Sequence, residues 1–254
     1  MIVPDSQTSP AAAADARVIA DGEGAILCDA GLAVQPDEHW FDPEHWRAQG
    51  NLRDQARGGR GSVVFVETPA GVCALRHYHR GGMVAPILGD RYLWVGVERT
   101  RGFAEFRLLA ELQRRGLPVP APVAARYRQR GMYYKADLLT RRIEHTRTLA
   151  ELISTGELDA GLGARVGALV ARFHAQGVDH ADLNAHNVLI GPNGLWLVDF
   201  DRGRIRESQG EWGLGNLRRL RRSLLKLGAG GHNEANFDQK IWTPLMSAYR
   251  GALP

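Results

Sequence analysis

The chain has few of the residues that would place it outside the cell or in a membrane. It contains only two cysteines, Cys28 and Cys73, too few for a disulfide framework and typical of a reducing compartment. No apolar run approaches the roughly 20 residues that a membrane-spanning helix needs. The N-terminus, with Pro4 and Asp5, lacks the basic-then-apolar order of a signal peptide. We therefore expect a cytoplasmic protein, either soluble or bound to a membrane surface.

Lysine is nearly absent as well. It occurs only at Lys135, Lys226 and Lys240, so the first 134 residues contain none. Arginine still gives the 254-residue chain a formal net charge of +4 and a pI of about 9.3. A basic excess indicates an anionic partner without naming it. Because no basic motif is interleaved with aromatic residues, we do not expect nucleic-acid binding.

The order of patterns predicts an α+β chain with two lobes. The hydrophobic fraction of 44% excludes global disorder. We expect a mobile tail over residues 1–20, an N-terminal nucleotide-binding lobe over 21–139 and a smaller C-terminal catalytic lobe over 140–254. The patterns predict helices at 43–49, 103–114, 149–153, 165–176, 217–227 and 238–249, and strands at 63–66, 72–75, 133–139, 188–190 and 195–198.

The strongest chemical signal lies between a predicted helix and a predicted hairpin. His180 and Asp182 are followed by Asn187, and Asp199 comes twelve residues later at the end of a short strand. Phosphoryl transfer from a nucleotide needs one carboxylate to accept the acceptor's proton, and a second carboxylate with an amide to hold Mg²⁺. Aspartate and asparagine oxygens suit that ion. Asp and Asn are also common in turns, but the spacing and the hairpin favour a kinase.

These residues carry a family resemblance. His180, Asp182 and Asn187 resemble the catalytic loop of protein-kinase-like enzymes, and Asp199-Phe200-Asp201 stands where those enzymes have Asp-Phe-Gly. Together with residues 76–82 and 199–203, they resemble the bacterial lipopolysaccharide kinases over about residues 40–245, especially the branch acting on 3-deoxy-D-manno-octulosonic acid (Kdo). The resemblance implies ATP and Mg²⁺ as cofactors, a two-lobed protein-kinase-like fold, Asp182 as catalytic base, Asn187 and Asp199 as metal ligands, and His180 as a structural residue.

The nucleotide lobe departs from the usual kinase pattern. Gly59 and Gly61 supply two of the three glycines of a phosphate-covering loop, although a glycine-rich turn is the more ordinary interpretation. The returning strand should end in a lysine that binds the phosphates, but Arg76 stands there. Arginine can serve, because it is permanently charged and its fork fits phosphate oxygens. Its helix partner is expected to be Glu105, with Glu111 as the competing choice.

Two groups of arginines indicate the acceptor. Arg202, Arg204 and Arg206 follow Asp199 closely and are candidates for binding an anionic acceptor such as a sugar carboxylate. The predicted helix 217–227 has a leucine stripe flanked by four arginines, at positions 218, 219, 221 and 222. Such a helix ordinarily packs on the core with solvated arginines. A lipid-linked acceptor would instead make it a basic face for anionic lipid.

The resemblance implies ATP-dependent phosphorylation of a Kdo hydroxyl, the 4-hydroxyl, on a Kdo-bearing lipid A precursor. The partners would be that glycolipid and the anionic cytoplasmic face of the inner membrane, to which the enzyme binds peripherally. One alternative is a kinase-fold enzyme acting on a soluble small molecule, although cationic acceptors suit acidic sites better than arginines. Another is a non-catalytic pseudokinase, favoured by the missing lysine. A protein kinase is disfavoured, because no Ala-Pro-Glu segment follows Asp199.

Overall fold

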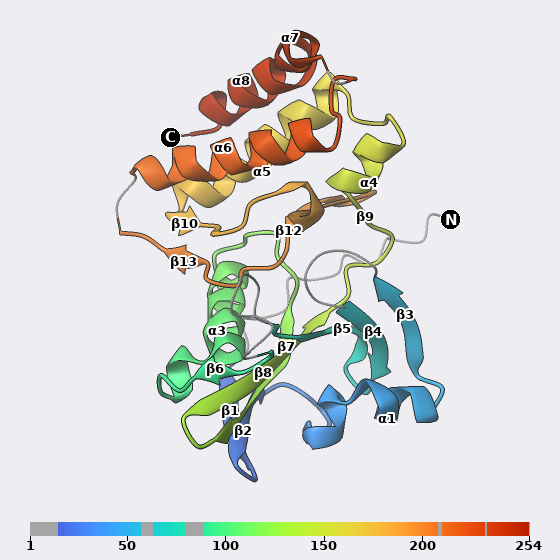
Figure 1. The fold of residues 1–254 in the computed structure, drawn as a ribbon, viewed down its shortest axis with the longest axis vertical. Coiled ribbons are helices and arrows are strands. Elements are labelled where there is room, and N and C mark those ends of the chain that lie inside the picture. The colour runs from blue at the N-terminus through green and yellow to red at the C-terminus, as the bar shows by residue number, and fades with distance from the viewer. Residues whose placement is uncertain (1–14, 57–62, 80–88, 208–209, 232, 254) are drawn as a thin grey trace, which may run out of the picture.

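The chain folds into two lobes, one built on a sheet and one built of helices (Figure 1). The structure is a computed structural model that describes residues 15–56, 63–79, 89–207, 210–231 and 233–253. The predicted Gly59 and Gly61, and most of the predicted tail, lie outside these residues. No helix among the described residues has both the length and the apolar character needed to cross a membrane.

The N-terminal lobe is a sheet with one long helix. Its elements in chain order are β1 (Ala16–Asp21), β2 (Gly24–Asp29), η1 (Glu38–Phe41), α1 (Pro43–Ala48), β3 (Leu52–Ala56), β4 (Val63–Thr68), β5 (Gly71–His77), β6 (Tyr92–Leu93), η2 (Val97–Arg99), α3 (Arg101–Arg114), β7 (Pro122–Arg130) and β8 (Tyr133–Arg141). The strands are antiparallel in the order β1-β2-β7-β8-β5-β4-β3, with β6 paired to β8.

The C-terminal lobe is mainly helical. Its elements are β9 (Arg147–Thr148), α4 (Leu149–Ser154), α5 (Ala160–Ala175), β10 (Val178–Asp179), η3 (Ala185–Asn187), β11 (Val188–Gly191), β12 (Gly194–Leu197), β13 (Arg204–Ile205), α6 (Glu211–Lys226), α7 (Glu234–Phe237), η4 (Asp238–Trp242) and α8 (Thr243–Gly251). Helices α5, α6 and α8 stack above the small strands that face the N-terminal lobe (Figure 1).

The two faces of the large sheet bury different cores. On one face, Phe103, Phe106 and Leu109 of α3 join the core that continues into the C-terminal lobe. On the other face, Trp40 and Trp46 cover a separate cluster that includes Val66, Cys73 and Leu75. Strand residues alternate between these faces. Arg76 of β5, and Tyr78 just after its end, therefore point toward α3 and toward the contact between the lobes.

Gly102 explains how closely α3 approaches the sheet. A Cβ at this position would lie 2.7 Å from the carbonyl oxygen of Asp137 and 3.4 Å from that of Arg126. Only glycine lets the first turn of the helix lie directly on β7 and β8. The start of α3 is thereby seated on the sheet.

Several predicted elements are confirmed, with shifted ends. The helix predicted from residue 165 begins at Ala160, because Asp159 caps it by accepting a hydrogen bond from the Leu162 N–H at 2.7 Å. The helix predicted from 217 begins at Glu211. The expectation of a tail to residue 20 is wrong for residues 16–20, which pair with β2 as part of β1 and whose side chains alternate between exposed and intermediate burial.

Candidate active site

The catalytic loop is held by its backbone and leaves one carboxylate unengaged. The side-chain amide of Asn187 donates to the backbone carbonyl of Asp182 at 2.9 Å, and Asn184 donates to the same oxygen at 2.9 Å. Asp182 is exposed, and its carboxylate forms no hydrogen bond or ion pair with any described residue. A carboxylate on a fixed backbone with free oxygens can accept a proton from a bound hydroxyl.

His180 holds this loop through both of its ring nitrogens, and these contacts define the tautomer of its imidazole ring. Its Nδ1 lies 3.2 Å from the backbone N–H of Asp182, and its Nε2 lies 3.0 Å from the carbonyl oxygen of Val198. Because the N–H of Asp182 donates, Nδ1 must be the acceptor, and Nε2 must carry the proton donated to Val198. Burial lowers the pKa of His180, so the ring is neutral, as both bonds require. The structural role expected for His180 matches these contacts.

The two predicted metal ligands lie next to each other. The Val198 N–H donates to the carbonyl oxygen of Asn187 at 3.0 Å, which places Asp199 one residue from that contact. The backbone φ of Asp199 is 63°, in the left-handed region that few non-glycine residues adopt. Such conformations persist where the surroundings impose them, often at functional sites. The amide oxygen of Asn187 has no partner among the described residues.

Arg76 stands at the centre of a polar group that we call the Arg76 cluster: Arg76, Tyr78, Glu105 and Asp199. The Arg76 guanidinium forms ion pairs with Glu105 of α3 and with Asp199. Its Nη2 also donates to the Tyr78 hydroxyl at 3.0 Å. The predicted pairing with Glu105 is confirmed, whereas Glu111 pairs with Arg114 and Arg115 on the helix surface.

Burial and charge oppose each other in the Arg76 cluster. Burial raises the pKa of Glu105 to about 6, although Arg76 opposes the shift. Burial also acts to raise the pKa of Asp199, but the charge and hydrogen bonds of Arg76 outweigh it and leave this pKa lowered. The pKa of Arg76 itself lies well above its ordinary value, because the neighbouring carboxylates outweigh its burial. At neutral pH, two negative carboxylates therefore surround one cation.

Residues missed in the sequence join the two lobes. The Tyr78 hydroxyl donates to Glu105 at 2.6 Å, and the other Glu105 oxygen accepts from the Phe200 N–H at 3.0 Å. Arg101, at the start of α3, forms an ion pair with Asp201. Tyr78 could have been found from its place two residues after Arg76 on a strand, where side chains share a face. No sequence signal identified Arg101.

A second polar group supports the loop from below; we call it the Asn216 network: His174, Asp179, His180 and Asn216. The buried Asn216 of α6 accepts from the His180 N–H and donates to Asp179, both at 3.0 Å. His174 lies 3.4 Å from the same Asn216 oxygen and 2.8 Å from the Tyr249 hydroxyl of α8. Burial lowers the pKa of His174 to about 4. The network thereby connects α5, α6 and α8 to Asp179 and His180, at the start of the catalytic loop.

The arginines predicted for the acceptor differ in their surroundings. Arg206 forms an ion pair with Asp179 at 2.7 Å, so it is engaged within the C-terminal lobe. Arg202 and Arg204 are exposed, and no described residue forms an ion pair with either. Of the four arginines on α6, Arg221 pairs with Glu234 and Asp238 at 2.7 and 2.9 Å. That arginine belongs to the packing of α6 against α7 and η4.

The donor set fits Mg²⁺ bound together with a nucleotide. Mg²⁺ is usually held by one or two carboxylates and by substrate phosphates, not by a complete protein cage. Asp199 and the free amide oxygen of Asn187 match that pattern. No group of three or more His, Cys, Asp or Glu side chains in the described part of the chain could hold a metal by itself. These two residues could therefore hold Mg²⁺ only together with further ligands, such as substrate phosphates.

Comparisons with known proteins identify the family to which the chain is similar. The model of the Lipopolysaccharide kinase (Kdo/WaaP) family matches residues 43–249. A Stenotrophomonas maltophilia (strain R551-3) protein named 3-deoxy-D-manno-octulosonic acid kinase is 48% identical over 232 residues, covering 90% of each chain. A protein of the same name from Xanthomonas campestris pv. campestris (strain B100) is 50% identical over 210 residues, covering 81% of this chain and 82% of that protein.

A solved structure supplies the fold. The structure titled "WaaP in complex with acyl carrier protein" aligns with a TM-score of 0.53 and 16% identity, covering 92% of this chain and 89% of that chain. At this identity the likeness concerns the fold alone, which is the predicted two-lobed, protein-kinase-like α+β fold. The family match over most of the chain, together with relatives of such identity and coverage, shows that this protein belongs to the lipopolysaccharide kinase (Kdo/WaaP) family.

Proposed function

We propose that the protein transfers the γ-phosphoryl group of ATP to a hydroxyl of Kdo during synthesis of the lipopolysaccharide core. The observation that carries this proposal is the joint placement of Asp182, Asn187, Asp199 and the Arg76–Glu105 pair at the contact between the lobes. The names of relatives covering 90% of the chain support Kdo as the acceptor.

The chain's own residues divide the work of transfer. Asp182 accepts the proton of the attacking hydroxyl as the bond to phosphorus forms, and its free carboxylate suits that task. Asn187 and Asp199 would hold Mg²⁺, which neutralises charge on the phosphates. Catalysis by this arrangement is mostly positioning, because the loose transition state needs little covalent help from the protein.

Arg76 is proposed to bind the nucleotide phosphates in place of the usual lysine. Its guanidinium is already shared between Glu105 and Asp199 through different nitrogens. Arginine has five donors in a rigid fork, so it can keep one carboxylate while turning another donor to a phosphate oxygen. Gly59 and Gly61, which lie outside the described residues, remain proposed parts of the loop over those phosphates.

For the finer points we propose the 4-hydroxyl of Kdo on a lipid A precursor, at the cytoplasmic face of the inner membrane. The exposed Arg202 and Arg204 lie shortly after Asp199 and suit a sugar carboxylate or phosphate. Arg206 is less available, because it is paired with Asp179.

The test is to incubate the full chain with Mg-ATP and Kdo-bearing lipid A precursor and to measure the mass of the product. We expect a gain of one phosphate on the Kdo residue, with Asp182→Asn as the inactive blank. Phosphorylation of a soluble metabolite, but not of Kdo, would assign the protein to the small-molecule kinases. Nucleotide binding without transfer to any acceptor would indicate a pseudokinase.

A further inference from the structure

An apolar patch lies at the tip of the N-terminal sheet. Met132, in the turn between β7 and β8, is 72% exposed, and Leu93 and Val95 beside it are 50% and 48% exposed. The backbone joins them: Leu93 pairs with Tyr133, and the Trp94 N–H donates to the carbonyl of Met132 at 2.9 Å. We call Leu93, Val95 and Met132 the tip patch. Large exposed apolar side chains grouped in this way mark an interaction surface.

The alternation of the strands explains why these side chains point outward. Tyr92 and Trp94 face inward. Their ring centroids lie 5.6 and 6.1 Å from that of Tyr134, and the ring centroid of Trp94 lies 5.2 Å from that of Tyr127. Since successive side chains alternate, Leu93 and Val95 must point away from the aromatic core. The inward rings hold the backbone, so the apolar side chains are presented on a rigid support.

Unpaired arginines surround the tip patch. On β7, Arg128 pairs in register with Lys135, and Arg130 with Tyr133, so both arginines share the face of the sheet to which Leu93 belongs. Arg91 precedes β6 and is also exposed. Within the described part of the chain, none of these three arginines forms an ion pair. Lys135, by contrast, is paired with Asp90 at 2.6 Å.

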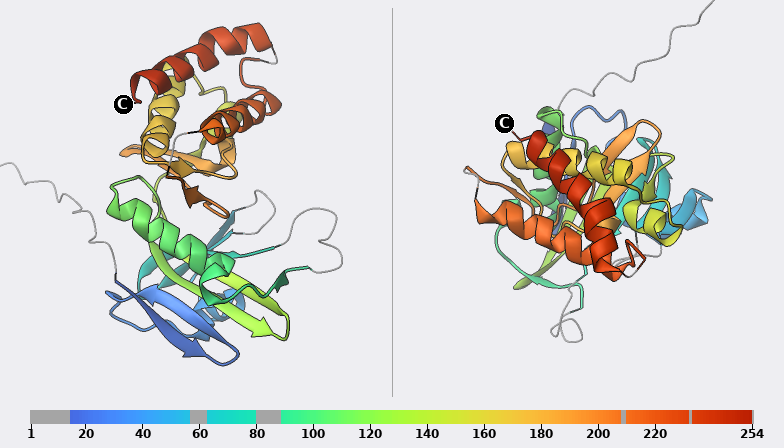
Figure 2. Two further views of the ribbon diagram at one scale, coloured as in Figure 1. Left: turned by 90° about the vertical axis from the view of Figure 1, so that its left-hand side faces the viewer. Right: turned by 90° about the horizontal axis from the view of Figure 1, so that it is seen from above.

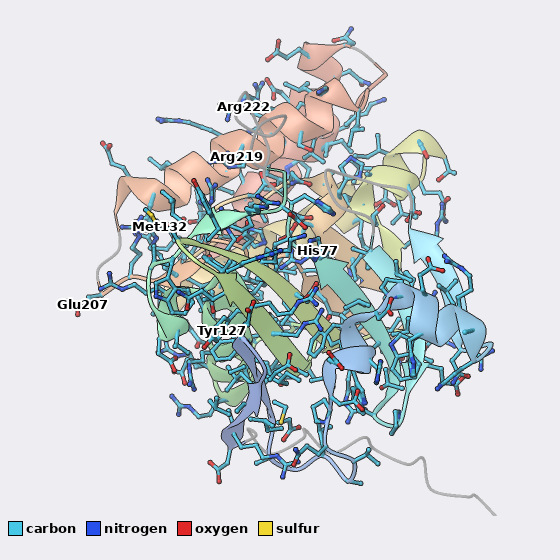
Figure 3. The ribbon with its side chains drawn as sticks, turned by 60° about the horizontal axis from the view of Figure 1, so that its bottom comes forward. His77, Tyr127, Met132, Glu207, Arg219 and Arg222 are labelled. Carbon is cyan, nitrogen blue, oxygen red and sulfur yellow. The ribbon has the colours of Figure 1, made fainter. Side chains whose placement is uncertain are left out.

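The tip patch is connected to the active site through α3. The hydroxyl of Tyr134, on β8 beside the patch, accepts from the N–H of Arg101 at 3.3 Å, and Arg101 in turn pairs with Asp201. Figure 2 shows the end of β7 in the N-terminal lobe and helix α6 in the C-terminal lobe. Figure 3 labels Met132 in the N-terminal lobe and Arg219 and Arg222 on α6 of the other lobe.

We propose that the tip patch and its three arginines dock the N-terminal lobe on an anionic lipid bilayer, with Met132, Leu93 and Val95 entering the interface. Apolar side chains ringed by cations match a surface that is negative outside and apolar beneath. This inference rests on the proposed function in one respect, that the acceptor is carried by a membrane. A second copy of the chain fits poorly, because a symmetric contact would bring arginines against arginines.

Vesicle binding tests the docking without ATP or acceptor, so its outcome is independent of the kinase assay. Cosedimentation with phosphatidylcholine vesicles containing phosphatidylglycerol should show binding, and pure phosphatidylcholine should bind much less. Replacing Arg128 and Arg130 by glutamine should weaken binding about 30-fold at low salt, because each cation near the surface contributes about 1 kcal/mol. Glutamine at Arg165 and Arg250, two exposed arginines of the other lobe, makes the matched control and should change binding far less.

The apolar contribution has its own variants. Leu93→Ser with Met132→Ser should weaken binding about tenfold, and this loss should persist in high salt, whereas the effect of the arginine pair should fade. Val18→Ser is the control, because Val18 is 53% exposed on β1, which β2 separates from β7, and it is not part of the tip patch. A fluorophore on Met132→Cys should shift to the blue on anionic vesicles. It labels selectively, because Cys28 and Cys73 are buried.

Three results would overturn the proposal. The chain could fail to bind anionic vesicles at all. It could bind them while the probe at position 132 shows no spectral change, which would place the contact elsewhere, for example on α6. The serine and glutamine variants could also bind as well as wild type while losing affinity for a soluble acidic protein, which would identify a protein partner.

Discussion

The Arg76 cluster and the Asn216 network hold polar groups at the active site by opposite means. The first is charged and joins the lobes: one guanidinium lies between two carboxylates, with Tyr78 beside them. The second is built around a neutral amide and lies within the C-terminal lobe. Its histidines have lowered pKa values, because burial disfavours their charged form. Removing one partner from the charged cluster therefore leaves an unbalanced charge, whereas removing one from the network leaves an unsatisfied dipole.

Asp182 belongs to neither group, so replacing it should separate the loss of turnover from any loss of stability. Asp182→Asn should lower turnover by about 10²–10⁴, the usual loss for a general base, while leaving the free energy of unfolding and nucleotide affinity nearly unchanged. Kdo phosphorylation, denaturant unfolding and nucleotide titration measure the three quantities. Glu207→Gln, an exposed acidic residue after β13, is the control. Turnover within threefold of wild type would remove Asp182 from the role.

Arg76 tests whether the charged cluster needs a fork or only a charge. Arg76→Ala should destabilise the fold by about 3 kcal/mol, because the buried Glu105 and the partly exposed Asp199 lose their cation. Arg76→Lys should restore part of the stability but less of the nucleotide affinity, since one ammonium cannot bind both carboxylates as two guanidinium nitrogens do. The exposed pair Arg53–Glu67 supplies the control Arg53→Ala, with a change under about 0.5 kcal/mol. If lysine restores nucleotide affinity fully, the fork is unnecessary.

His174 tests the neutral network through pH. Burial lowers its pKa to about 4, below the ordinary value of about 6.5. Between these values the unfolded chain binds the proton and the folded chain does not, so this contribution to stability is lost as pH falls from about 6.5 to 4, by up to about 3 kcal/mol. His174→Gln should flatten this part of the curve of unfolding free energy against pH. The exposed His186 supplies the matched control, His186→Gln.

Asn216 should give the smallest effect. Asn216→Ala leaves the buried His180 N–H and one Asp179 oxygen without their partner, at a cost of about 2 kcal/mol. Turnover should fall by less than it does in Asp182→Asn, because Asp182 keeps its bonds to Asn184 and Asn187. Thermal unfolding and kinase rates measured on the same preparations compare the two effects. A loss of turnover as large as in Asp182→Asn would show that the network positions the catalytic loop directly.

The sequence predicts the site best where residues are close along the chain. His180, Asp182 and Asn187 share one loop, and a short hairpin links that loop to Asp199, so their spacing carries the geometry. Arg76 and Glu105 were found from the order strand then helix. Asn216 and Arg101 were not, because their partners lie far away in sequence and only the packing of α6 and α3 brings them together. The edge strand β1 was missed because its six residues carry a weak alternation of exposed and half-buried positions.

Gly102 has a consequence for how this enzyme could be regulated. In protein kinases, activity is controlled by swinging the helix that carries the glutamate toward or away from the phosphate-binding cation. Here the first turn of α3 touches the backbone of β7 and β8, where there is no room for even a methyl group. An outward swing would have to break that contact together with the pairs of Glu105 and Arg101. Such a helix favours a permanently assembled catalyst, whose output follows the supply of acceptor instead of an on–off switch within the lobe.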